Sequence, residues 1–161
     1  MDNIEVMQAA ITYFGNDRRR INHLMKVNTF SNIIGQEEGL SKQEIEILDV
    51  ASILHDIGIK LSEEKYGSSE GKYQEIEGPS VAENILEKLN YSEEFIDRVK
   101  YLIGHHHTYT NIEGLDYQIL VEADFLVNLD EDHMSQQAVQ SVDEKIFKTV
   151  SGRKLLHQLF L

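Results

Sequence analysis

The stretch IEILDVASILHDIGI, residues 45–59, decides the fold that we predict for this chain. Its apolar side chains fall on almost every side of a helix, which predicts a buried helix rather than one with a single apolar face. His55 and Asp56 stand side by side near its end. Burying such groups costs free energy unless a partner compensates. Because imidazole and carboxylate commonly bind divalent metals, the pair predicts a metal ion.

The composition is that of a folded chain of one domain. Hydrophobic residues make up 41% of the 161 residues and charged residues 27%, which is typical of globular proteins rather than disordered ones. The formal net charge of −13 repels polyanions and argues against a surface that binds nucleic acid polymers. A small phosphorylated substrate stays compatible with it, because a local basic patch and a metal can outweigh the global field.

The sequence also favours a cytoplasmic protein that does not bind membranes. No apolar run approaches the roughly 18 residues of a membrane span, and the start MDNIEVMQAA lacks the features of a signal peptide. Cysteine is absent, so we expect no disulfide and no thiol chemistry. The oligomeric state stays open, because the apolar tail at residues 155–161 can pack on the core or on a second subunit of a homodimer.

The apolar spacing elsewhere predicts an all-helical fold. Residues 60–78 contain the run GSSEG and are expected to form a loop over the site, either a lid or a surface insertion. Pro79 suits the first turn of the following helix. A capping-box pattern at Ser141 and Glu144 marks a helix start near the C-terminus. The other expected helices span about residues 3–14, 17–38, 41–58, 79–89, 92–103 and 115–129.

Several ionisable residues lie within these apolar helices. His23 belongs to the second helix, Asp124 to the helix at 115–129, and three consecutive histidines end the helix at 92–103. Each has an ordinary structural explanation when taken alone, such as a hydrogen-bonded core histidine or a helix cap. Together they predict convergence on a cation. Cations flank His23 on one helix face, which is either a solvated basic face or a phosphate-binding one: Arg19, Arg20 and Lys26.

The order His23, His55–Asp56, Asp124 resembles the HD superfamily of metal-dependent phosphohydrolases. The flanking segments LHDIG and VEADFLVNL are similar to those of that family as well, and the resemblance covers residues 17–130. It implies an all-α, HD-domain-like helical bundle of about six to eight helices. The four residues are then expected to hold one buried metal ion. We expect a single domain over residues 1–161, with its core at 17–130 and a helical extension at 131–161.

The resemblance also raises the question of a second metal, which many members of the superfamily hold with additional histidines. Glu77 stands where the first of these histidines is expected, which departs from the pattern but leaves a carboxylate. The other position falls among His105, His106 and His107, with His106 favoured. Asp56 would bridge two ions. The ligand types suit manganese, iron, cobalt, nickel, zinc or magnesium.

The implied reaction is hydrolysis of a small phosphorylated substrate, with a nucleotide as the first expectation, by attack of metal-activated water on phosphorus. Asp56 would accept the proton of the water, Lys60 would neutralise the phosphate, and His106 would protonate the leaving oxygen. Two other functions fit the same resemblance, a di-iron oxygenase and a non-catalytic HD-like signalling module. Aromatic residues of the expected loops are candidates to stack on a base: Tyr66, Tyr73 and Tyr109.

Overall fold

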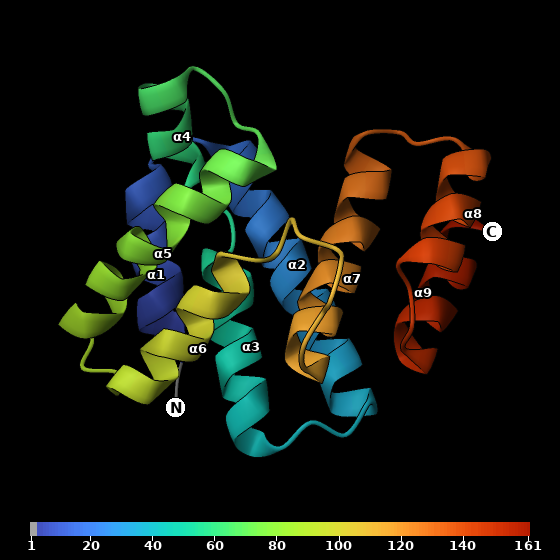
Figure 1. Ribbon diagram of the computed structural model, residues 1–161, viewed down its shortest axis with the longest axis horizontal. Coiled ribbons are helices and arrows are strands. Elements are labelled where there is room, and N and C mark those ends of the chain that lie inside the picture. The colour runs from blue at the N-terminus through green and yellow to red at the C-terminus, as the bar shows by residue number, and fades with distance from the viewer. Residues whose placement is uncertain (1–2) are drawn as a thin grey trace.

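All regular secondary structure in the described part of the chain is helical, which confirms the predicted fold class (Figure 1). The computed structural model describes residues 3–161, and this range contains nine α-helices and no β-strand. The helices are α1 (Ile4–Phe14), α2 (Arg18–Glu37), α3 (Lys42–Leu54), α4 (Ile59–Tyr66), α5 (Gly71–Lys88), α6 (Glu93–Ile103), α7 (Leu115–Glu131), α8 (Gln136–Lys145) and α9 (Val150–Phe160).

Helix α3 is central because its sequence leaves it almost no polar face. Ala51, Ile53 and Leu54 are completely buried, and the helix packs against α1, α2, α6 and α7. Burying an isoleucine or leucine side chain in this way stabilises the fold by roughly 1.5–3 kcal/mol. Ser41 and Glu44 form the expected capping box at its start. The helix therefore ends at a fixed depth in the core, which places His55 and Asp56 inside the protein.

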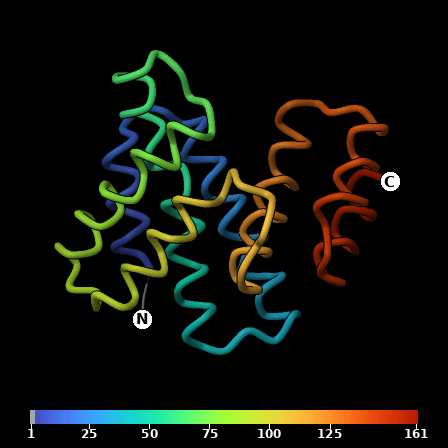
Figure 2. The backbone as a smooth tube through the Cα atoms, in the orientation of Figure 1, coloured from blue at the N-terminus to red at the C-terminus, as the bar shows by residue number. Residues whose placement is uncertain are grey.

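The other helices surround α3 in two groups. Figures 1 and 2 show α2, α3 and α7 in the middle of the molecule, with α4, α5 and α6 on one side and α8 and α9 on the other. Helix α7 is, like α3, apolar on nearly every side, and it packs against α2 and α3. These three helices bring together residues that lie about a hundred positions apart in the sequence. Within residues 3–161, no helix combines the length and the apolarity that crossing a membrane requires.

The C-terminal helices are attached to α7 through a buried carboxylate. Glu122 is completely buried and accepts hydrogen bonds from the backbone N–H groups of Lys148 and Thr149, each at 3.0 Å, and from the Thr149 hydroxyl at 2.6 Å. Thr149 is the N-cap of α9. The capping box predicted at Ser141 is wrong, because α8 already begins after the N-cap Ser135.

The segment at 60–78, predicted to be a loop, is mostly helical. Helix α4 ends at Gly67, whose left-handed φ of 65° suits glycine, and only a short link precedes α5. The prediction that Pro79 begins a helix is wrong, because Pro79 lies inside α5. The preceding residue, Gly78, has no Cβ to clash with the proline ring, which explains why the helix continues through it. The additional helix raises the number of helices above the expected range.

Gly58 allows the turn after α3 to approach α5 closely. A Cβ added at Gly58 would lie 2.6 Å from the Gly78 nitrogen and 2.7 Å from the Gln74 carbonyl oxygen. Both are backbone atoms, so Gly58→Ala should lower the free energy of unfolding by about 2 kcal/mol through overpacking. Urea denaturation measures this change. Gly35→Ala is the matched control, because its Cβ meets only leucine and isoleucine side chains. Equal loss in the two variants would contradict the expectation.

Candidate metal centre

Four of the predicted ligands converge at the meeting point of α2, α3 and α7. His23 comes from α2, His55 is the C-cap of α3, Asp56 follows it, and Asp124 comes from α7. The His23 Nε2 atom lies 3.1 Å from the His55 Nε2 atom, 3.1 Å from an Asp124 oxygen and 3.2 Å from an Asp56 oxygen. The His55 Nε2 atom lies 3.4 Å from each of the same two carboxylates.

These separations fit ligands that share one cation. Ligand atoms about 2.1 Å from a metal and at right angles to each other lie about 3 Å apart. Two imidazole nitrogens that face each other at 3.1 Å can share at most one hydrogen bond. A divalent ion between the two imidazoles and the two carboxylates would instead satisfy all four groups at once. The donor set therefore fits a divalent metal.

The histidines are oriented by hydrogen bonds to their other ring nitrogens. The Nδ1 atom of His55 lies 2.6 Å from the Ser52 carbonyl oxygen, and that of His106 lies 2.7 Å from the Ile103 carbonyl oxygen. An N–H donated to a carbonyl leaves the Nε2 lone pair available for a metal. The His106 Nε2 atom is buried without a hydrogen-bond partner, which is costly unless a ligand completes it.

The His23 imidazole is oriented by a carboxylate instead. Its Nδ1 atom lies 2.7 Å from an oxygen of Glu131, the last residue of α7. The sequence interpretation missed Glu131. A usable signal exists, because Asp124 and Glu131 are seven residues apart, which is two helical turns, and therefore share one face of α7.

The electrostatics of the cluster favour positive charge strongly. Burial alone would lower the pKa values of the two histidines, but hydrogen bonds and charge from Asp56 and Asp124 outweigh it. They raise the pKa of His23 to about 11 and that of His55 to about 10. In turn, the histidines hold the pKa values of both carboxyls below their ordinary range, although burial alone would raise them. Without a metal, the cluster therefore holds protons.

A pH dependence follows for the metal-stripped protein. Because the folded-state pKa values of His23 and His55 lie above the unfolded value near 6.5, the stabilisation is fully present below about pH 6.5. It should be lost as the pH rises toward 10 and 11. We expect the melting temperature of chelator-treated protein to fall between pH 6.5 and 9.5, and that of metal-loaded protein to fall less. A melting temperature of the stripped protein that rises over this range would contradict the assignment.

A second group of ligand types adjoins the first. Asp56, His106 and His107 place one ligand atom each within 4.8 Å of one another, and the His106 Nε2 atom lies 3.4 Å from an Asp56 oxygen. The turn after α6 is fixed by Glu75, which accepts from the backbone N–H of His107 at 3.1 Å. The Nε2 atom of His107 lies 3.1 Å from the amide oxygen of Gln74. Asp56 thus faces both groups.

Two predicted ligands of a second metal lie outside this group. The Glu77 carboxylate accepts hydrogen bonds from the Lys65 ammonium at 2.5 Å and from the Tyr66 hydroxyl at 3.1 Å. These two bonds turn it toward α4. His105 stacks on Tyr101, and its Nδ1 atom lies 2.7 Å from the Tyr101 carbonyl oxygen. Consecutive residues after a helix diverge in direction, so only part of the histidine triplet can face the centre.

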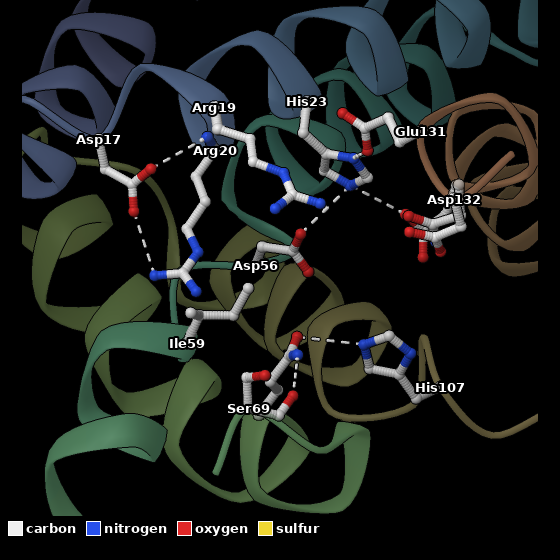
Figure 3. A pocket seen from close by; sticks show the side chains of 13 residues that line it. Asp17, Arg19, Arg20, His23, Asp56, Ile59, Ser69, His107, Glu131 and Asp132 are labelled. Carbon is white, nitrogen blue, oxygen red and sulfur yellow. Dashed lines mark hydrogen bonds and ion pairs between the residues drawn. The ribbon is translucent and has the colours of Figure 1, made fainter. Parts of the chain in front are cut away.

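A cavity of about 590 Å³ opens in front of His23 and Asp56 (Figure 3). Arg19 and Arg20 line it. Arg20 is held by Asp17 at 3.1 Å and by Glu63 at 2.6 Å. The remaining lining residues are Asp17, Ile59, Ser69, Gln74, His107, Asp124, Asn128, Glu131 and Asp132.

The two predicted phosphate-binding lysines do not line this cavity. The Lys60 ammonium lies over the ring of Tyr13, 5.2 Å from its centroid. Because successive helical residues differ by about 100° in direction, Ile59 faces the cavity and Lys60 the outer side. Lys26 lies one turn beyond His23 and lines a separate groove with Phe30 and Leu159. The roles predicted for Lys60 and Lys26 are corrected accordingly.

The tyrosines predicted to stack on a base do not line this cavity, and each contacts another aromatic ring. Tyr66 and Tyr73 stack on each other with ring centroids 4.2 Å apart. Tyr109 packs against Phe125 with a centroid distance of 5.1 Å. Among residues 3–161, the only ring side chains that line the cavity are the imidazoles of His23 and His107.

Comparisons with known proteins bear on the family and on the fold. The HD domain family model matches residues 20–149 of the chain. A crystal structure described as a predicted HD superfamily hydrolase from an uncultured Thermotogales bacterium is similar over 96% of this chain and 82% of that chain. The TM-score is 0.68 at 24% sequence identity, which shows a shared fold. No curated protein matches the chain significantly.

Proposed function

The chain belongs to the HD domain family, and from this premise we propose that it is a metal-dependent phosphohydrolase acting on a small phosphorylated molecule. One observation supports this most strongly. The Nε2 atoms of His23 and His55 lie 3.1 Å from each other and 3.1–3.4 Å from carboxylate oxygens of Asp56 and Asp124, beside a cavity that Arg19 lines. Metal ligands beside a cationic side chain suit the charge of a phosphoryl group.

The proposed metal is divalent and held by His23, His55, Asp56 and Asp124. When bound, such an ion would lower the pKa of a water molecule and polarise a phosphoryl oxygen. Arg19, whose guanidinium has no ion pair among the described residues, would neutralise the phosphate and orient it. Nucleotides are the first substrate class implied by the family resemblance.

Hydrolysis adds water across the phosphorus–oxygen bond, so one proton must leave the water and one must reach the leaving oxygen. We propose Asp56 as the acceptor of the water proton, because its carboxylate lies in the cavity wall. His106 is better suited to bind a metal than to act as the predicted general acid. Its Nδ1 atom is paired with the Ile103 carbonyl oxygen, and its side chain is buried. The cavity is open at the exposed residues Arg19 and Asp132, so solvent can protonate the leaving oxygen.

A di-iron oxygenase is the second candidate. The group formed by Asp56, His106 and His107 favours it, because it offers a place for a second ion beside the first. A non-catalytic signalling module is less well supported, since each of the four primary ligand positions carries a residue able to bind metal. Oxygen consumption by the iron-loaded protein separates the oxygenase from the hydrolase.

Phosphate release tests the proposal. We expect metal-stripped protein to release no phosphate from a panel of nucleotides and simple esters, and protein refilled with manganese, cobalt, iron or magnesium to release it. A protein that binds metal but hydrolyses no member of the panel would contradict the proposed function. Protein that binds no divalent metal would contradict the metal centre itself.

A further inference from the structure

The cavity contains polar side chains that the metal centre does not use. Arg19, Asn128 and Asp132 line it, and none of the three side chains has a hydrogen bond or ion pair within the part of the chain that the structure describes. By contrast, Arg20 is held by Asp17 and Glu63. A half-buried amide without a partner, such as that of Asn128, is a group for which a ligand supplies the missing hydrogen bonds.

One face of α7 forms a wall of the cavity. Asp124 and Asn128 are four residues apart and therefore lie one turn apart on the same face, with Asp132 one turn further. Asp124 belongs to the metal centre, so the other two residues extend outward from the place where the phosphoryl group would sit. They are in position to contact whatever is esterified to that group.

The chemistry of these side chains selects hydroxyl groups. A carboxylate accepts hydrogen bonds only, and an amide side chain both donates and accepts, so Asp132 and Asn128 together suit the O–H groups of a diol. A second phosphoryl group would meet the carboxylates of Asp17, Glu131 and Asp132. Arg19 would be the single cation without an ion pair among the described residues that line the cavity.

A nucleobase finds no platform in the same cavity. No tyrosine is among the described residues that line it, and Ile59 is the one apolar residue in that lining. Tyr66 and Tyr73 stack on each other, and Tyr109 packs at a tilt against Phe125. Bases are commonly bound by stacking on aromatic or apolar side chains. The lining therefore offers hydrogen bonds rather than stacking.

We propose, on the basis of the hydrolase function proposed above, that the substrate is a phosphomonoester of a sugar or another polyol, with its hydroxyl groups held by Asn128 and Asp132. A nucleoside monophosphate would then be read through its ribose and not through its base. Hydrolysis of such an ester breaks the bond between phosphorus and the bridging oxygen, and it yields inorganic phosphate and the free polyol.

The test compares esters that differ in a single hydroxyl group. We expect kcat/KM for ribose 5-phosphate to exceed that for 2-deoxyribose 5-phosphate by about tenfold, the value of one or two hydrogen bonds to polar side chains. The same preference should separate AMP from dAMP, whereas AMP and CMP should differ by less than about threefold. Asn128→Ala and Asp132→Ala should bring the ribose preference close to one. Asp130→Asn, an exposed carboxylate on the same helix that does not line this cavity, should leave that preference as in the wild type.

The outcomes distinguish this inference from the proposed function. Hydrolysis of all the esters without a hydroxyl preference, or with a strong dependence on the base, would overturn the polyol assignment and leave the phosphohydrolase intact. If no ester is hydrolysed, the proposed function fails. Calorimetric binding of the two sugar phosphates to the metal-loaded protein then decides the assignment: tighter binding of the ribose ester supports it, and equal or absent binding overturns it.

Discussion

Replacing Asp56 with alanine should abolish tight metal binding and lower phosphate release by about a thousandfold. The Asp56 carboxylate faces both groups of potential ligands, with one oxygen 3.2 Å from His23 and the other 3.4 Å from His106. Its loss removes a ligand of the primary centre and the bridge to the second one. Metal-assisted hydrolysis relies on several kcal/mol of stabilisation by the ion, and each 1.36 kcal/mol corresponds to a factor of ten in rate.

The matched control is Asp130→Ala, which removes an exposed carboxylate from α7 outside the cavity. Metal content after dialysis and phosphate release should both match the wild type. Because Asp56→Ala removes a partner of the buried His23, thermal denaturation of both variants accompanies the assay. A folded Asp56→Ala protein that retains its metal and more than about a tenth of its rate would show that another group performs the chemistry.

Glu131→Gln should weaken metal binding by about ten- to a hundredfold. The glutamate lies 2.7 Å from the His23 Nδ1 atom, so it fixes the ring and increases the basicity of the Nε2 atom. Glutamine keeps the size and removes the charge. Competition with a chromogenic chelator measures the dissociation constant of cobalt or zinc independently of any activity.

The effect of Glu131 must be separated from the general effect of charge. Asp130→Asn removes the same charge from the adjacent residue, which is exposed and lines a groove separate from the cavity at His23. We expect its metal affinity to stay within about threefold of the wild type, as for a solvent-exposed charge. Equal weakening in both variants would mean that net charge, and not the orientation of His23, sets the affinity.

The sequence predicted the centre of the fold well because the relevant signals are local. The all-round apolar pattern at 45–59 identifies α3 as buried, and its capping box fixes where that helix begins. A helix that is buried at its end carries its last residues into the core. His55 and Asp56 therefore had to lie inside, whatever the positions of the other helices.

The features that the sequence did not predict depend on the direction in which each helix points its side chains and on partners far apart in the sequence. The run GSSEG in residues 67–71 suggested a long loop, although only a short link separates α4 from α5. Lys60 faces away because the turn at Gly58 sets the phase of α4, and a sequence pattern does not define that phase. Glu77 is held by Lys65 and Tyr66 across two helices, and no spacing rule indicates that contact.

The most direct measurement of the central claim is the position of a bound metal. Crystals of the manganese- or cobalt-loaded protein, measured at the absorption edge of the metal, give an anomalous difference peak for each ion. We predict a peak among the Nε2 atoms of His23 and His55 and the carboxylates of Asp56 and Asp124. Crystals that contain metal by X-ray fluorescence but show their peaks only elsewhere would contradict the account.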